Sequence, residues 1–258
     1  MLNGFSDTVR QHDPDRFFTA LFAPPEKRES LFALYAFNHE LARARDVVSE
    51  PHLALIRLHW WREVVQGTAK RHPLAEAISR CLDDGSLDAD DLLGMIAARE
   101  VEADTEIATV ADWLLYLLDS AGGVMTAAAR LLGADEPQTL RPLGAAYGVA
   151  GILRAVPMLA RQGRCLLPAD VLTKCGLSPA ALVGGADAAP VIRDLAAEGL
   201  ALLRPERLGR HVIAAVLPAV LARRDLVRLR ATAMGSDVPR GLGDRLAVTW
   251  AAWRGRIG

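Results

Sequence analysis

The sequence predicts an all-α protein in which residues 1–258 form one helical domain. Ala and Leu are abundant, and these residues are among those that form helices at the lowest cost. Apolar residues recur with helical spacing along most of the chain, whereas few stretches alternate with the period of two that a half-buried strand requires. Neither a repeat of fixed period nor a convincing linker divides the chain, and 258 residues suffice for one large core.

In the first half of the chain, prolines and acidic caps set the expected helix boundaries. The first helix must end before Pro24 and Pro25, because proline has no amide hydrogen to donate within a helix. Pro51 marks the end of the second helix, and Asp88 or Asp90 is expected to cap the fifth. The expected helices cover residues 7–20, 27–48, 52–67, 73–83 and 90–102.

In the second half, glycine and proline separate the expected helices. Gly133 closes the sixth helix and Pro137 precedes the seventh. Residues 163–168 are expected to be a non-helical connector, and residues 176–189, rich in Gly, Ala and Pro, are expected to form a loop. The expected helices cover residues 110–132, 138–160, 169–175, 190–203, 209–231 and 240–254.

Charge and composition exclude several classes of function. The formal net charge of −1 creates no overall field that recruits nucleic acid, so no nucleic-acid partner is expected. The three cysteines are widely spaced, which argues against a disulfide framework or a zinc site and fits a reducing compartment. Residues 1–7 lack the features of a signal peptide, and the apolar run 212–221 is about half as long as a membrane span. We therefore expect a cytoplasmic protein, with a peripheral membrane contact left open.

Four segments carry a resemblance to a known family. In order along the chain they are residues 31–46, residues 58–73 with Leu58-His59-Trp60-Trp61-Arg62, Ser120-Ala121-Gly122-Gly123-Val124, and residues 152–170 with Gly163-Arg164-Cys165-Leu166-Leu167-Pro168. Together they resemble the squalene/phytoene synthases over residues 10–175 or so. The resemblance implies the isoprenoid synthase fold, a single-domain helical bundle around a central cavity that holds prenyl chains.

The resemblance also implies where catalytic acids should lie. Enzymes of this family join two prenyl diphosphates head to head, and magnesium bound to carboxylates neutralises the departing pyrophosphate. Two helices each present aspartates four residues apart, and this spacing places the aspartates on one face. Here the first pair falls on Ala42 and Asp46 and the second on Ala155 and Leu159, with Met158 where a further acid often stands. Asp46 is therefore the one residual catalytic candidate, and no metal site is expected.

Arginines surround the places where the acids are missing. Arg43 and Arg45 lie within the first motif, and Arg154 and Arg164 fall where family members keep basic residues near the diphosphates. A guanidinium group binds anionic oxygens bidentately, so these arginines are candidates to hold a phosphate or an acidic partner without a metal. Alternatively, they neutralise carboxylates of the chain itself, namely Glu40, Asp46 and Asp170.

The cavity that the resemblance implies lies between the helices expected over residues 27–48 and 138–160. Met125 stands where active relatives usually carry a small residue, so its side chain would narrow this cavity. The residues expected to line the cavity are Tyr35, Asn38, Ala42, Gly122, Met125, Gly151, Ala155 and Leu159.

The first motif is also similar to that of a non-catalytic branch of the family, the complex I assembly factor-like proteins. The similarity lies in Phe37-Asn38-His39-Glu40-Leu41-Ala42, followed by Arg45-Asp46 and Ser49-Glu50, and the composition favours a bacterial member. The leading hypothesis is a catalytically degenerate protein, an assembly factor that binds a protein partner or a prenyl-type lipid without a cofactor. The alternative is an active prenyl transferase that joins two prenyl diphosphates with magnesium, and a third hypothesis is a plain prenyl-lipid carrier.

Overall fold

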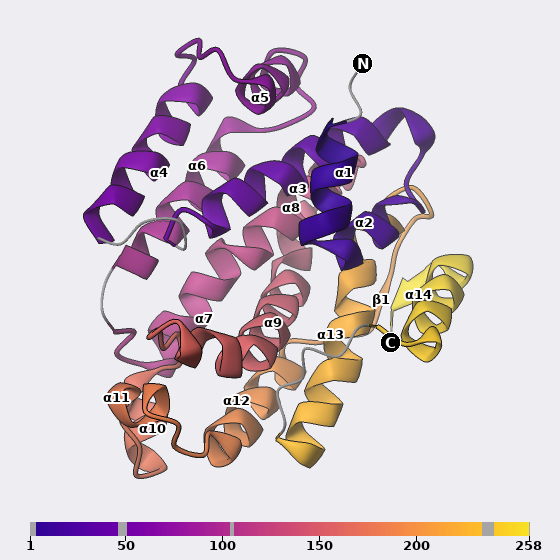
Figure 1. Cartoon of the computed structure of the whole chain (residues 1–258). Coiled ribbons are helices and arrows are strands. Elements are labelled where there is room, and N and C mark those ends of the chain that lie inside the picture. Colours follow the sequence, from indigo (N-terminus) through magenta and orange to yellow (C-terminus); the bar gives the residue numbers. More distant parts are fainter. Residues whose placement is uncertain (1–3, 46–50, 104–105, 234–239, 258) are drawn as a thin grey trace.

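The computed structural model describes residues 4–45, 51–103, 106–233 and 240–257 of the chain. These residues form an all-α single domain, as the sequence predicts (Figure 1). The described strands are two short segments, β1 (Glu206–Arg207) and β2 (Arg256–Ile257), which pair antiparallel near the C-terminus.

The helices of the first half begin and end close to the expected boundaries. Asp88 caps α6 by accepting the amide hydrogens of Asp90 and Asp91, which confirms the expected cap. The elements are α1 (Gly4–His12), α2 (Pro14–Ala20), η1 (Pro25–Lys27), α3 (Arg28–Ala42), α4 (Pro51–Val65), α5 (Pro73–Asp83), α6 (Ala89–Glu100) and η2 (Val101–Ala103).

The second half holds the longest helices of the described chain. Figure 1 shows α9, α12 and α13 in one half of the molecule, α3 to α6 in the other, and α8 between them. The elements are α7 (Val110–Asp119), α8 (Ala121–Leu131), η3 (Pro137–Leu140), α9 (Arg141–Arg161), α10 (Ala169–Lys174), α11 (Pro179–Val183), α12 (Ala189–Ala201), α13 (Ile213–Thr232) and α14 (Leu242–Arg254).

Two expected helices are each divided in the structure. The helix expected over residues 7–20 is broken because Pro14 begins α2, and the Asp13 carboxylate accepts the amide hydrogen of Arg16 at 3.0 Å. The helix expected over residues 110–132 is broken at Ser120, which takes a non-helical ψ of −83°. The Ser120 hydroxyl donates to the carbonyl oxygen of Tyr116 at 2.6 Å, a local hydrogen bond that competes with helix continuation.

Two further boundaries differ from expectation. The helix expected over residues 27–48 ends at Ala42, and its last three expected residues lie outside the described part of the chain. The loop expected over residues 176–189 contains the short helix α11, which Ser178 caps by accepting the amide hydrogen of Ala181.

The crossing of α8 and α9 forms the centre of the core and depends on glycine. A Cβ atom added to Gly144 would lie 2.7 Å from both the carbonyl oxygen of Ala121 and the Cα atom of Gly122. A Cβ atom added to Gly122 would lie 2.7 Å from the carbonyl oxygen of Arg141. The two backbones therefore approach more closely than any larger residue at these positions would allow.

The segment Pro137–Arg161 is long and apolar enough to cross a membrane, but half of its most apolar stretch is buried inside the protein. The helix α9 within it packs against α7, α8, α12 and α13. It is thus placed as a core helix, and it carries the second segment in which the family keeps its acids.

Candidate functional site

Both helices that should carry catalytic acids lie against α8. Ala42 ends α3 with a half-buried methyl group, and on α9 Ala155 is half-buried while Leu159 is buried. Met158 is exposed to solvent. These positions therefore offer apolar side chains and no metal ligand, and Asp46 lies outside the described residues.

The face of α9 that contains Ala155 borders open space. Gly151 lies one helical turn before Ala155 and is exposed, and a Cβ atom added to it would meet nothing within 4 Å. This position differs from Gly122 and Gly144, whose added Cβ atoms would clash with neighbouring backbone.

A buried polar cluster centres on Glu102, a residue outside the four segments that carry the family resemblance. Its Oε1 atom accepts hydrogen bonds from Arg99 Nη1 at 2.6 Å and from the Tyr116 hydroxyl at 2.8 Å. Its Oε2 atom accepts a hydrogen bond from Arg164 Nη2 at 2.9 Å. Asn38 joins the cluster because its Oδ1 atom accepts from Arg99 Nη2 at 3.5 Å.

The cluster keeps Glu102 ionised although the side chain is only 7% exposed. Burial raises the pKa of Glu102, but attraction to Arg99 and hydrogen bonds from Arg99 and Tyr116 outweigh burial, so the pKa lies below its ordinary value. Burial likewise raises the pKa of the Tyr116 hydroxyl, which stays protonated as a donor. One carboxylate is thus shared by two guanidinium groups in the interior of the protein.

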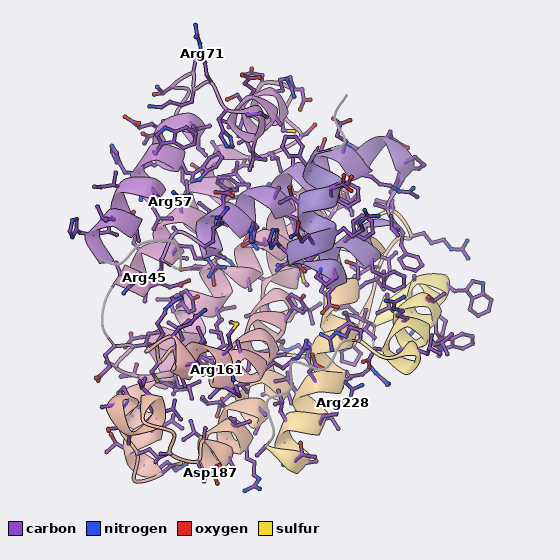
Figure 2. All side chains as sticks on the ribbon, in the orientation of Figure 1. Arg45, Arg57, Arg71, Arg161, Asp187 and Arg228 are labelled. Carbon is purple, nitrogen blue, oxygen red and sulfur yellow. The ribbon has the colours of Figure 1, made fainter. Side chains whose placement is uncertain are left out.

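The other carboxylate near the first motif is also paired. Glu40 Oε1 accepts from Arg43 Nη1 at 3.1 Å, and Glu40 Oε2 accepts from Arg57 Nη2 at 3.5 Å. Arg43 therefore neutralises Glu40, one of the two roles that the sequence left open. Figure 2 shows Arg45 and Arg57 along the same edge of the molecule and Arg161 lower in the view, at the end of α9.

A hollow of about 330 Å³ opens beside this Glu40 pair. Trp61 is buried in its wall and Trp60 is half-buried, so the two adjacent rings differ in exposure as their positions on a helix require. The lining residues are Glu40, Ile56, Arg57, Trp60, Trp61 and His72. Because its one carboxylate already pairs with Arg57, this hollow offers no unpaired carboxylate to a metal ion.

Arg154 belongs to a second ionic cluster, between α9 and α13. Arg154 Nη1 lies 3.4 Å from Asp225 Oδ2, and Arg240 Nη1 lies 2.6 Å from Asp225 Oδ1. Arg240 also binds Asp15 of α2 at 2.7 Å. This cluster ties α2 and Arg240, two residues before α14, to the core, and its carboxylates come from distant parts of the sequence, Asp15 in α2 and Asp225 in α13.

The remaining residues expected around the cavity are mostly packed. Tyr35 is buried, with the Arg16 guanidinium 5.7 Å from its ring centre. Asn38, Gly122 and Met125 are buried as well. That these residues line a prenyl cavity stays a prediction.

The donor set around α3 and α9 does not fit magnesium. Magnesium prefers carboxylate and water oxygens in octahedral geometry, but the three described family positions carry Ala42, Ala155 and Leu159. The nearby carboxylates Glu40 and Glu102 are held by guanidinium groups. Among the described residues, no group of three or more His, Cys, Asp or Glu side chains is placed to hold a metal ion.

Comparison with known proteins settles the family. The family model for squalene/phytoene synthase matches residues 9–250. This chain belongs to the squalene/phytoene synthase family. The fold agrees, because a crystal structure of a dehydrosqualene synthase superposes with a TM-score of 0.72 at 18% identity, covering 98% of this chain and 95% of that one. The squalene synthase HpnC from Alicyclobacillus acidocaldarius superposes with a TM-score of 0.61 at 19% identity, with the same coverage.

Curated relatives of this family member are described as assembly factors. The human "NADH dehydrogenase (ubiquinone) complex I, assembly factor 6" is 26% identical over 180 residues, which cover 67% of this chain and 54% of that protein. The Drosophila melanogaster homolog is 28% identical over 190 residues, which cover 66% of this chain and 55% of that protein. The chain thus spans about half the length of these relatives.

Proposed function

We propose that this chain is a catalytically silent member of the squalene/phytoene synthase family that acts as an assembly factor through a protein partner. The observation that carries the proposal is the replacement of the metal-binding carboxylates by apolar side chains. Where a synthase needs carboxylates, the described residues supply Ala42, Ala155 and Leu159, and the buried Glu102 is held between Arg99 and Arg164.

The physical argument concerns the departure of pyrophosphate. Ionisation of an allylic diphosphate builds negative charge on the leaving group, and in this family magnesium held by acids neutralises that charge. Replacing the acids with apolar side chains removes the ligands that bring the dication, while the helices that would surround a prenyl chain persist. Acids are missing from two separate helices, α3 and α9, so one incidental substitution does not explain their loss. The loss indicates that the chain no longer needs to ionise a diphosphate.

The curated relatives support an assembly role. Their names associate them with complex I, and the match to the human protein covers 67% of this chain. For this chain we propose the same role, assembly of a respiratory complex, with a subunit of that complex as the partner. We propose that it acts in the cytoplasm and without a metal cofactor. Binding of a prenyl-type lipid in the cavity that the family resemblance implies is compatible with this role.

The catalytic half of the proposal is tested by incubating the protein with farnesyl and geranylgeranyl diphosphates and magnesium. We expect no release of pyrophosphate above the level without protein, whereas a dehydrosqualene synthase assayed alongside releases it. Release that disappears in Asp46→Ala would show that the residual acid works and would defeat the silent assignment.

The assembly half is tested by deleting the gene and measuring the assembled NADH dehydrogenase complex on native gels. We expect less assembled complex, restored by the wild-type gene and equally by Asp46→Ala, because the role does not need the acid. An unchanged amount of complex after deletion would contradict the assembly role and leave the test of catalysis unaffected.

A further inference from the structure

The helix α14 exposes a continuous apolar stripe. Leu242 is 79% exposed, Leu246 68%, Trp250 57% and Trp253 67%. Their spacing of four, four and three residues places all four side chains on one face of the helix. Figure 1 shows α14 at the outer edge of the molecule.

The opposite face of α14 is fixed to the core, so the orientation of the stripe is determined by packing. Asp244, Val248 and Ala251 are buried on that face, and α14 packs against α13. Asp244 Oδ1 accepts a hydrogen bond from Arg224 Nε at 2.5 Å and another from Arg228. These contacts hold the two tryptophans on the solvent side, where their rings stack with centres 5.1 Å apart.

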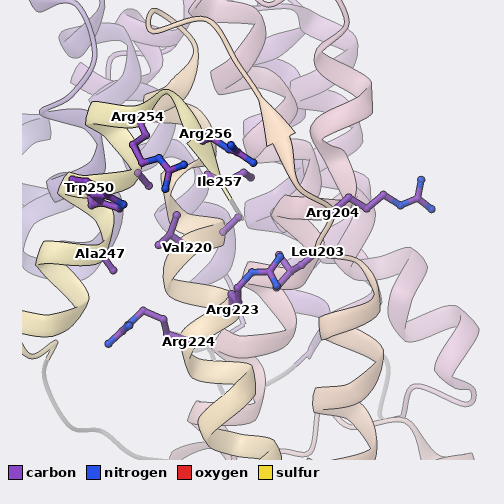
Figure 3. A pocket seen from close by; sticks show the side chains of 12 residues that line it. Leu203, Arg204, Val220, Arg223, Arg224, Ala247, Trp250, Arg254, Arg256 and Ile257 are labelled. Carbon is purple, nitrogen blue, oxygen red and sulfur yellow. The ribbon is translucent and has the colours of Figure 1, made fainter.

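A hollow of about 220 Å³ beside the stripe is lined by arginines. Figure 3 shows the side chains that line it, which come from α13, α14, β2 and the segment between α12 and β1. The charged lining residues are Arg204, Arg223, Arg224, Arg254 and Arg256, and none of the described residues that line this hollow is acidic. Trp250 of the stripe is also part of its wall, so the hollow and the stripe are continuous.

Much of this positive charge is not neutralised by the described residues. Arg224 pairs with Asp244, and the Arg254 guanidinium lies 5.7 Å from the ring centre of Trp250. Within the described part of the chain, Arg204, Arg223 and Arg256 make no ion pair or side-chain hydrogen bond. An apolar stripe thus lies directly against a site that attracts anions.

Charge complementarity selects the occupant of this surface. Tryptophan and leucine next to arginine are the residue types with which an amphipathic helix enters the boundary between lipid headgroups and acyl chains. A symmetric contact with a second copy would bring the arginines of both copies toward each other, which is unfavourable. We propose that α14 and the arginine hollow form a peripheral docking site for a bilayer of anionic phospholipids.

In this arrangement, Leu246, Trp250 and Trp253 enter the headgroup region, and the arginines of the hollow bind a lipid phosphate. The proposal rests on α14 and its neighbours and not on α3 or α9, so it holds whether or not the protein is catalytically silent. The membrane contact would thus lie on α14, apart from α3 and α9, the helices on which the family keeps its catalytic acids.

The test is flotation of the full chain with vesicles of phosphatidylcholine alone and of phosphatidylcholine with phosphatidylglycerol. We expect binding to the anionic vesicles, weakened by salt because screening reduces the arginine–lipid attraction. Trp250→Ser/Trp253→Ser and, separately, Arg223→Gln/Arg256→Gln should each reduce the partition coefficient about tenfold.

Matched controls change exposed apolar residues and exposed arginines on other faces. Leu55→Ser/Ile56→Ser removes exposed apolar surface from α4, and Arg71→Gln/Arg80→Gln removes two exposed charges; both should bind as the wild type does. Circular dichroism confirms that each variant is folded.

Absence of binding to anionic vesicles, or binding that the tryptophan variant leaves unchanged, overturns the proposal. A concentration-dependent dimer in sedimentation velocity, dissolved by Trp250→Ser/Trp253→Ser in a protein that ignores vesicles, would assign the stripe to a second copy and would also overturn it.

Discussion

At the scale of single residues, Glu102 shows how strongly the interior depends on one carboxylate. Arg99, Arg164 and Tyr116 all donate hydrogen bonds to it. Glu102→Gln keeps the shape but removes the charge, so Arg99 and Arg164 lose the buried carboxylate that they share. We expect the free energy of unfolding to fall by about 3–5 kcal/mol, measured by urea denaturation.

Glu106→Gln is the matched control for this prediction. It is the same chemical change four residues away, at an exposed side chain, and should alter the free energy of unfolding by less than about 0.5 kcal/mol. Equal effects of the two substitutions would show that the buried network contributes nothing specific.

Asp244 gives a prediction that depends on pH. Burial raises its pKa, but hydrogen bonds from Arg228 and Arg224 outweigh burial and lower the pKa to about 2. The ionised carboxylate therefore stabilises the fold above the ordinary pKa of 3.8, and this contribution is lost as the pH falls toward 2. Asp244→Asn should lower the free energy of unfolding at pH 7 by about 1–2 kcal/mol, allowing for screening of the partly exposed arginines.

The signature of this mechanism is the shape of the pH profile. In urea titrations at successive pH values, the difference between the wild type and Asp244→Asn should narrow between about pH 4 and pH 2. A difference that stays constant over this interval would mean that the substitution acts through packing and not through charge.

At the scale of secondary-structure elements, the crossing of α8 and α9 gives two glycines of α9 different surroundings. Gly144 lies at the crossing, and Gly151 borders open space. A Cβ atom at Gly144 would lie 2.8 Å from Met125 Cβ, in addition to its backbone clashes, so Gly144→Ala forces the helices apart. We expect a loss of about 1–3 kcal/mol in the free energy of unfolding. Gly151→Ala adds the same methyl group into open space and should stabilise α9 by up to about 1 kcal/mol.

Thermal melting of both variants checks this prediction, since each glycine lies within α9 and gains the same helix propensity on substitution. Stabilisation by both alanines would show that α8 and α9 can separate without cost. Destabilisation by both would show that the space beside Gly151 is filled.

The helix boundaries also show how much of the fold the local sequence pattern predicts. The sequence places the helix over residues 138–160 and the helix over residues 240–254 within a few residues of α9 (Arg141–Arg161) and α14 (Leu242–Arg254), because apolar spacing is a property of the segment itself. It misses the breaks at Pro14 and Ser120. The signal for the first break was present, since proline begins helices readily, whereas the Ser120 break depends on a single side-chain hydrogen bond.

The candidate site was predicted only in part, for the same reason. The loss of acids at Ala42, Ala155 and Leu159 is visible in the motifs themselves. The partners of the arginines are not, because Arg164 meets Glu102 across 62 residues of sequence, and periodicity indicates a buried face without naming what packs on it. The spacing of Arg99 and Glu102 by three residues was the one local hint of this cluster.

At the scale of the whole molecule, the family fold persists while apolar side chains stand at the described positions where the family keeps its acids. If the backbone still presents α3 and α9 as the family does, restoring acids should restore affinity for a dication. Ala42→Asp/Ala155→Asp restores one carboxylate to each of the two helices, and the chain also keeps Asp46. We expect magnesium at about ten times its dissociation constant to stabilise this variant by about 1.4 kcal/mol, a rise of a few degrees in Tm.

The wild type should show no such rise, and neither should Ala42→Asn/Ala155→Asn, which has the same side-chain shapes without charge. Differential scanning fluorimetry with and without magnesium separates these cases, and calcium serves as a second hard cation that prefers oxygen ligands. A wild-type protein stabilised by magnesium as strongly as the aspartate variant would mean that the native chain already assembles a dication site. The fold would then have kept the electrostatics of a synthase, and the assembly role would have to coexist with catalysis.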